Sequence, residues 1–160
     1  MADILQEVLK KLDDNKEISS ASFEAANIIL YTKNKEFFID NKGRIRELVN
    51  EFKKRIELRP DPKLSISQEK AEKAIREILP TECNVAQIIF DPQRSRVIIE
   101  AEKPGLAIGK SGELLQKIKE ATFWVPLIKR TPSIRSIIIE NIRAVLYENN
   151  DFRKKFLNQV

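Results

Sequence analysis

The sequence predicts an α+β protein made of two copies of one unit, each a three-stranded sheet with helices on one face. Apolar and glycine positions recur at an offset of 69 residues, so that Ile28-Ile29-Leu30 corresponds to Val97-Ile98-Ile99 and Gly43 to Gly112. The periodicity of both copies indicates the order helix, strand, strand, helix, loop, helix, strand. A proline-rich stretch, Arg59-Pro60-Asp61-Pro62, separates the copies.

The first copy occupies residues 1–60. Apolar spacing and strand-forming residues predict a helix, a strand, a helical turn, a helix and a short strand, over residues 3–12, 23–31, 35–39, 44–54 and 55–58. Because proline interrupts helices and central strands, we place a linker over 61–66.

The second copy occupies residues 67–132. Its expected elements are a helix, a hairpin of two strands, a short helix, a helix and a strand, over residues 68–79, 85–90, 96–101, 104–108, 113–122 and 124–129. Ser65 and Gln68 fit a capping box, and Pro104 suits the first turn of the short helix. A final helix that begins at Thr131-Pro132, with a tail, takes up 133–160.

Composition points to a binding protein and away from an enzyme. The chain has 160 residues, 42% of them hydrophobic and 33% charged, and it contains no histidine. The missing histidine excludes serine–histidine and cysteine–histidine catalytic groups and histidine-bound zinc, so we expect no cofactor in this chain. The single cysteine, Cys83, excludes an internal disulfide. No apolar run is long enough to cross a membrane, and we expect a cytoplasmic location.

Positive charge and glycine concentrate in the same segment. The net charge is +5, and residues 103–130 contain six lysines and arginines but only two glutamates. Three of the four glycines, Gly105, Gly109 and Gly112, lie in this segment. A local basic excess indicates a polyanionic partner, and clustered glycines indicate that the backbone must bend or approach something closely.

Two nucleotide-binding motifs are excluded at this glycine cluster. A phosphate-binding loop of the Walker A type requires glycine at the position of Pro104, and a Rossmann fingerprint requires glycine at the position of Ala107. The remaining pattern is a helix, the loop Gly109-Lys110-Ser111-Gly112, and a second helix. Bare backbone, a helix amino end and Lys110 together suit a sugar-phosphate strand, with apolar residues of the short helix and of the strand 96–101 as the floor of a groove.

This arrangement resembles the KH domain of type II, and the resemblance implies binding of single-stranded RNA. The expected RNA-contacting residues are Gly109, Lys110, Ser111 and Gly112, joined by Lys103 and Lys117 from the basic segment. In the first copy the equivalent loop is Asp40-Asn41-Lys42-Gly43, in which Asp40 replaces the first glycine. We therefore expect the first copy to be a degenerate KH domain that binds RNA weakly or not at all.

A narrower resemblance is to the amino-terminal tandem KH region of archaeal β-CASP ribonucleases related to cleavage and polyadenylation specificity factor. Residues 97–113, 130–132 and 137–143 carry it. The family implies U-rich RNA near transcript 3′ ends, a role in 3′-end processing or termination, and a zinc-dependent metallo-β-lactamase nuclease as parent chain or separate subunit. It also implies a homodimer of the full-length protein. Zinc is expected only in that nuclease part, because its zinc motif requires histidine.

Two alternatives remain open. One is a tandem KH transcription factor similar to NusA that acts without any nuclease. The other is a protein-interaction scaffold whose RNA binding has lapsed and whose apolar last helix, with Ile137, Ile138 and Ile142, contacts a partner.

Overall fold

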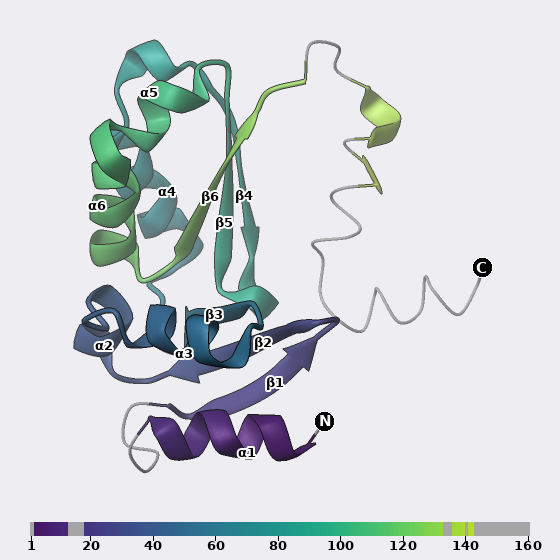
Figure 1. Ribbon diagram of the computed structural model, residues 1–160. Coiled ribbons are helices and arrows are strands. Elements are labelled where there is room, and N and C mark those ends of the chain that lie inside the picture. Colours follow the sequence, from purple (N-terminus) through teal and green to yellow (C-terminus); the bar gives the residue numbers. More distant parts are fainter. Residues whose placement is uncertain (1, 13–17, 133–135, 140, 143–160) are drawn as a thin grey trace. The chain divides into compact units, whose positions relative to one another are not determined.

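The chain folds into two compact units, Met1–Ile66 and Ser67–Val160. The computed structural model describes residues 2–12, 18–132, 136–139 and 141–142. Each unit contains one three-stranded sheet, with strand orders β1-β2-β3 and β4-β5-β6 (Figure 1). In each sheet the first two strands are antiparallel and the last two are parallel.

The first unit contains three helices and three strands among its described residues: α1 (Ala2–Lys11), β1 (Ser20–Glu24), β2 (Asn27–Thr32), α2 (Lys35–Ile39), α3 (Arg44–Phe52) and β3 (Ile56–Pro60). The continuous strand expected over 23–31 is wrong, because this segment contains the turn of a hairpin in which Glu24 pairs with Asn27. The hairpin supplies the two successive strands that the repeat predicts for this copy. The chain reverses at Ala25, which adopts a left-handed conformation with φ of 54°. Alanine is no turn signal in sequence, so the reversal escaped prediction.

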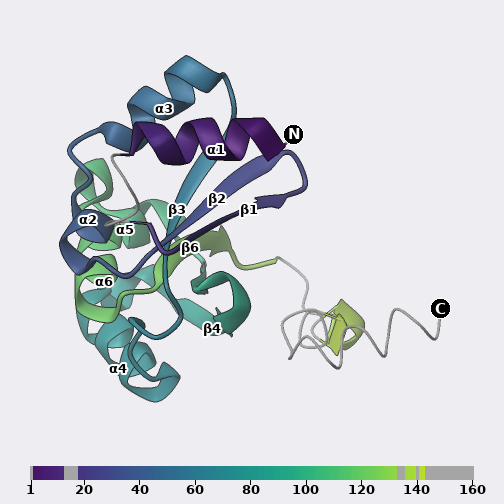
Figure 2. The same ribbon diagram turned by 90° about the horizontal axis from the view of Figure 1, so that it is seen from below.

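The helices of the first unit pack on one face of its sheet. One buried cluster contains Val8 of α1, Leu12 directly after it, Leu48 of α3, and Ile28 and Leu30 of β2. Figure 2 shows α1 and α3 beside each other over the strands, and Lys11 Nζ lies 2.8 Å from Glu51 Oε1 across them. Burial of this apolar face, at about 25 cal/mol per Å², provides the main stabilisation of the unit.

Strand β3 extends two residues beyond the expected strand, through Arg59 and Pro60. Pro60 is tolerated because β3 is an edge strand of its sheet. Arg59 is 1% exposed and its guanidinium lies 2.6 Å from Glu24 Oε2 and 3.2 Å from Glu57 Oε1. Burial lowers the pKa of Arg59, but its hydrogen bonds to Glu57, Glu24 and Tyr31 outweigh burial and raise the pKa, so the cation persists.

The second unit repeats this order: α4 (Gln68–Ile78), β4 (Val85–Asp91), β5 (Arg96–Ala101), α5 (Pro104–Ile108), α6 (Glu113–Thr122) and β6 (Val125–Arg130). The bounds of β5, α5 and α6 are those expected from the sequence. The capping box at Ser65 is wrong, because α4 has Ser67 as its N-cap and this side chain makes no cap hydrogen bond.

Helices α4, α5 and α6 lie on one side of the second sheet (Figure 1). Ala71 and Ile75 of α4, Ile118 of α6, and Val97 and Ile99 of β5 are fully buried between the layers. Trp124 is also buried and meets Phe90 edge to face with ring centroids 5.0 Å apart, so it belongs to the core and does not present a stacking surface.

The repeat offset of 69 residues holds for the elements around both loops. Strand β2 corresponds to β5 and helix α2 to α5 at both ends, and α3 and α6 begin at equivalent residues. The predicted fold class, an α+β chain with two repeated units, is confirmed. Most of the final helix expected from Thr131 lies outside the described residues. Ile137 and Ile138 are described, and both are exposed.

Candidate nucleic-acid interface

The loop Gly109–Gly112 joins α5 to α6, and the loop Asp40–Gly43 joins α2 to α3 at the equivalent place in the first unit. The last two positions of both loops share one backbone conformation. Lys42 and Ser111 have φ of 50° and 55°, and Gly43 and Gly112 have φ of 79° and 81°. The first position differs, because Gly109 has φ of 76° and ψ of 178° whereas Asp40 is extended with φ of −133°.

Gly109 is required by its surroundings as well as by its own backbone. Its φ and ψ lie in a region that is almost confined to glycine. A Cβ atom at this position would lie 2.8 Å from Leu114 Cγ and 3.2 Å from Leu114 N, at the amino end of α6. The missing side chain therefore brings the loop backbone against the helix, which no larger residue permits.

The second loop offers unpaired backbone donors. Gly112 N–H donates to the Gly109 carbonyl and Glu113 N–H to the Lys110 carbonyl. Within the described part of the chain, the N–H groups of Lys110 and Ser111 have no acceptor. Both residues are exposed. Because these donors lie just before the amino end of α6, an anion placed there would gain hydrogen bonds and a favourable helix dipole.

The lysines named from the sequence lie on both sides of this loop. Lys103 is the N-cap residue of α5 and Lys117 lies on α6, and both are exposed. Among the described residues, neither of them nor Lys110 forms an ion pair. Lys103 N–H donates to the carbonyl of buried Cys83, whose thiol pKa is raised mainly by burial and less by Glu82, with Lys103 opposing.

The apolar surface beside the loop differs from the expected one. Strand β5 is buried along nearly its whole length between β4 and β6, so it does not form the floor of a groove. The exposed apolar side chains near the loop are Leu106 and Ile108 of α5, which are 47% and 37% exposed. The strand with an exposed apolar side chain is edge strand β6, where Leu127 is 41% exposed.

The first loop pairs its own donor. Asp40 Oδ1 accepts a hydrogen bond of 2.9 Å from Lys42 N–H, which is the group equivalent to the unpaired N–H of Ser111. A carboxylate of the protein thus occupies the place where an external anion would bind. The loop of the first copy thus differs from that of the second in the expected sense, and weak or absent RNA binding by this copy stays a prediction.

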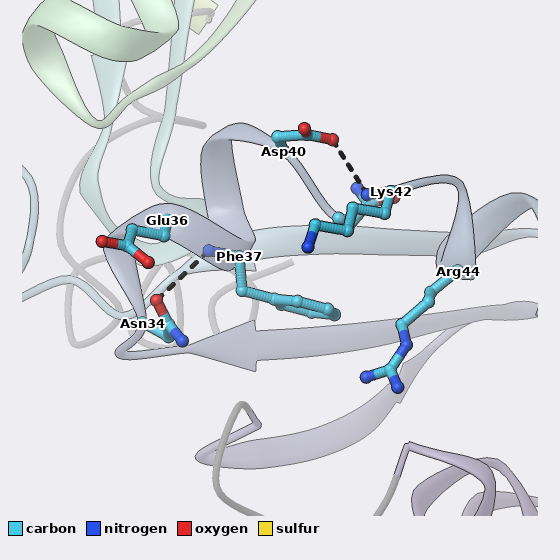
Figure 3. A pocket seen from close by; sticks show the side chains of 7 residues that line it. Asn34, Glu36, Phe37, Asp40, Lys42 and Arg44 are labelled. Atoms are coloured by element: carbon cyan, nitrogen blue, oxygen red, sulfur yellow. Dashed lines mark hydrogen bonds between the residues drawn. The ribbon is translucent and has the colours of Figure 1, made fainter.

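A hollow of about 300 Å³ lies beside the first loop, and sequence reasoning missed it. It is lined by residues of α2, the loop and the start of α3: Asn34, Glu36, Phe37, Asp40, Asn41, Lys42 and Arg44. Figure 3 shows the Phe37 ring flanked by the Lys42 and Arg44 side chains, with Glu36 directed away from the ring. No single motif marks these residues, although all of them lie within residues 34–44.

Comparison with protein families follows this division of the chain. Residues 1–65 match a family described as Transcription termination factor FttA, KH domain, and residues 70–122 match the KH domain family. The chain thus contains two KH domains in tandem, over these two regions. The second KH domain contains the loop with two glycines, and the first contains the loop with Asp40.

Archaeal proteins named Transcription termination factor FttA are similar to the chain over nearly its full length. The protein of Thermococcus kodakarensis is 40% identical over 162 residues, and that of Methanothermobacter thermautotrophicus is 39% identical over 160 residues. The protein of a Lokiarchaeum species is 28% identical over 158 residues. These matches cover 98% or more of this chain but 25% of each relative, so the tandem KH domains span about a quarter of the relatives' length.

Two further properties concern the described residues alone. They contain no group of three or more cysteine, aspartate or glutamate side chains placed to hold a metal ion. None of their helices combines the length and the apolar character needed to span a bilayer.

Proposed function

We propose that these tandem KH domains bind single-stranded RNA in transcription termination, and that the loop 109–112 holds the sugar-phosphate backbone. The main observation behind this proposal is that the N–H groups of Lys110 and Ser111, just before the amino end of α6, have no acceptor among the described residues. Phosphate oxygens satisfy such donors, and Lys110 adds a charge that is free to follow the strand. The names of the relatives support the link to termination.

Unpaired RNA suits the surface around this loop better than a duplex does. Leu106 and Ile108 present apolar side chains next to the phosphate-binding loop. Bases that are not stacked in a helix gain from such contacts, while paired bases hide their faces. The proposal therefore assigns phosphates to the loop and bases to the exposed side of α5.

We further propose that the RNA is U-rich, lies near transcript 3′ ends, and is presented to a zinc-dependent β-CASP nuclease. The nuclease belongs either to the same parent chain or to a partner subunit, and the full-length protein forms a homodimer. Support comes from the resemblance carried by residues 97–113 and from relatives about four times longer than this chain. Zinc would be held by that nuclease part, which supplies the histidines that this chain lacks.

The test is the double variant Lys110→Asp and Ser111→Asp, measured with a single-stranded oligouridylate. We expect a loss of affinity of at least about tenfold, because two carboxylates replace a cation and a neutral side chain at the phosphate position. The matched control is Gln68→Asp with Lys70→Asp, which makes the same charge change on exposed residues of α4. Equal RNA affinity of the folded loop variant and the wild type would refute the assignment.

Lys103 and Lys117 are tested by the salt dependence of RNA binding. Each change to glutamine should weaken binding and reduce the slope of log K against log salt by about 0.7 if one phosphate contact is lost. Lys73 is an exposed residue of α4, and Lys73→Gln serves as the control that should leave the slope unchanged. A slope unaffected by either loop-side change would remove these two lysines from the interface.

A further inference from the structure

The hollow beside Asp40 in the first KH domain has the chemistry of a site for a neutral, planar ligand. Its lining contains two cations, Lys42 and Arg44, and two carboxylates, Glu36 and Asp40, so its formal charge is zero. The Lys42 N–H is already paired with Asp40. A phosphate group would therefore find no unpaired backbone donor at Lys42 and would meet the negative charge of Asp40.

Side-chain amides supply unused hydrogen-bonding groups in this hollow. Asn34 accepts a hydrogen bond of 3.2 Å from Phe37 N–H through Oδ1, which leaves its Nδ2 donors unpaired among the described residues. The amide of Asn41 has no partner in this part of the chain either. Amides that present both donors and acceptors match the edges of nucleobases, which carry the same mixture.

The remaining walls suit the faces of a base. Phe37 is 6% exposed and forms an apolar floor, and the side chains of Lys42 and Arg44 flank its ring (Figure 3). Guanidinium groups and the stems of long cationic side chains pack against planar rings. A hollow of about 300 Å³ is at the small end of ligand pockets, which is appropriate for one base or nucleoside.

We propose that the hollow lined by Asn34, Phe37, Asn41, Lys42 and Arg44 binds one unpaired nucleobase without gripping its phosphate. The choice of a base rests on the proposed function, because the second KH domain would supply a single RNA strand on the same chain. In this proposal loop 109–112 binds phosphates of the RNA, and the first domain binds one of its bases. No residue of β3 lines this hollow, so the site is separate from a groove along the sheet edge.

The test is an amide-shift titration of the full chain with uridine, cytidine, adenosine and guanosine as separate probes. We expect at least one nucleoside to shift the amides of residues 34–44, with a dissociation constant that changes less than about twofold between low and high salt. The corresponding 5′-monophosphate should bind no more tightly. Asn41→Ala should weaken binding about tenfold, whereas Asn50→Ala on the exposed side of α3 should leave it unchanged.

The two proposals fail in different ways. If every nucleoside leaves residues 34–44 unshifted, or shifts only residues around 103–112, the base site is refuted and the RNA loop is untouched. If Lys110→Asp with Ser111→Asp leaves RNA binding intact, the loop assignment fails while nucleoside shifts at 34–44 still support the hollow. Binding that depends steeply on salt, or that requires the 5′-phosphate, would also overturn the base site.

Discussion

Asp40 Oδ1 lies 2.9 Å from Lys42 N, so the first KH domain satisfies internally the donor that the second leaves open at Ser111. The two loops otherwise share their backbone at these positions, with φ near 50° at Lys42 and 55° at Ser111. At the first loop position Asp40 has a carboxylate that closes its own loop, whereas Gly109 has no side chain.

Asp40→Gly should open the first loop to RNA. The change removes the carboxylate, frees Lys42 N–H and creates the sequence Gly-Asn-Lys-Gly. Measured with oligouridylate in the Lys110→Asp, Ser111→Asp background, RNA affinity should rise by about tenfold, which is the value of one charge-assisted hydrogen bond.

The chain contains a matched control for this change. Asp61 makes the same type of contact, accepting a hydrogen bond of 3.1 Å from Lys63 N–H outside either loop. Asp61→Gly alters charge and flexibility to the same extent, so it should leave RNA affinity unchanged. A similar gain from both variants would mean that net charge, and not the loop donor, controls binding.

Gly109 and Gly105 should respond oppositely to alanine. Gly109→Ala forces a Cβ atom into a glycine backbone conformation and against Leu114, so unfolding free energy should fall by about 2 kcal/mol or more. Gly105 lies in α5 with open space around the added carbon, and Gly105→Ala should raise stability by about 0.5–1 kcal/mol. Urea unfolding of both variants decides this, and equal destabilisation would contradict the packing argument.

The buried cation Arg59 should matter far more than an exposed one. Arg59→Met removes the cation that pairs with Glu24 and Glu57, and we expect a loss of about 3 kcal/mol, at the low end for buried pairs because both glutamates retain some solvent access. Arg76→Met removes the exposed pair with Glu72 and should cost less than about 0.5 kcal/mol.

A further substitution separates charge from packing in this comparison. Adding Glu57→Gln to Arg59→Met removes one of the two carboxylate charges that Arg59 no longer balances and should recover part of the stability. Urea unfolding measures all these variants. If Arg59→Met and Arg76→Met lose similar amounts, or if Glu57→Gln recovers nothing, the ion cluster is not what stabilises this part of the sheet.

The loop of the second KH domain was predictable because its signals are local. Pro104 marks the start of α5, and Gly109 and Gly112 mark the backbone turns that end it and begin α6. Each signal acts through the φ and ψ angles of the residue itself, which sequence reports directly.

The features that the sequence did not predict depend on contacts between different parts of the chain. The turn at Ala25 is imposed by pairing of the strands on either side, and no residue in it favours a turn. The exposed apolar side chain Leu127 is on β6 and not on β5, because β5 is the central strand and sheet order decides which strand is at the edge. Pro60 remains in a strand only because β3 is at the sheet edge.

By itself, the sequence determined the repeated α+β architecture, the position of the two-glycine loop and the exclusion of histidine chemistry, since periodicity, glycine placement and composition are properties of the chain. Only the tertiary structure decided that Asp40 closes its own loop, that Arg59 is buried among carboxylates and that Asn34 and Asn41 line one hollow. These depend on distances between atoms that folding brings together, which no spacing along the chain specifies.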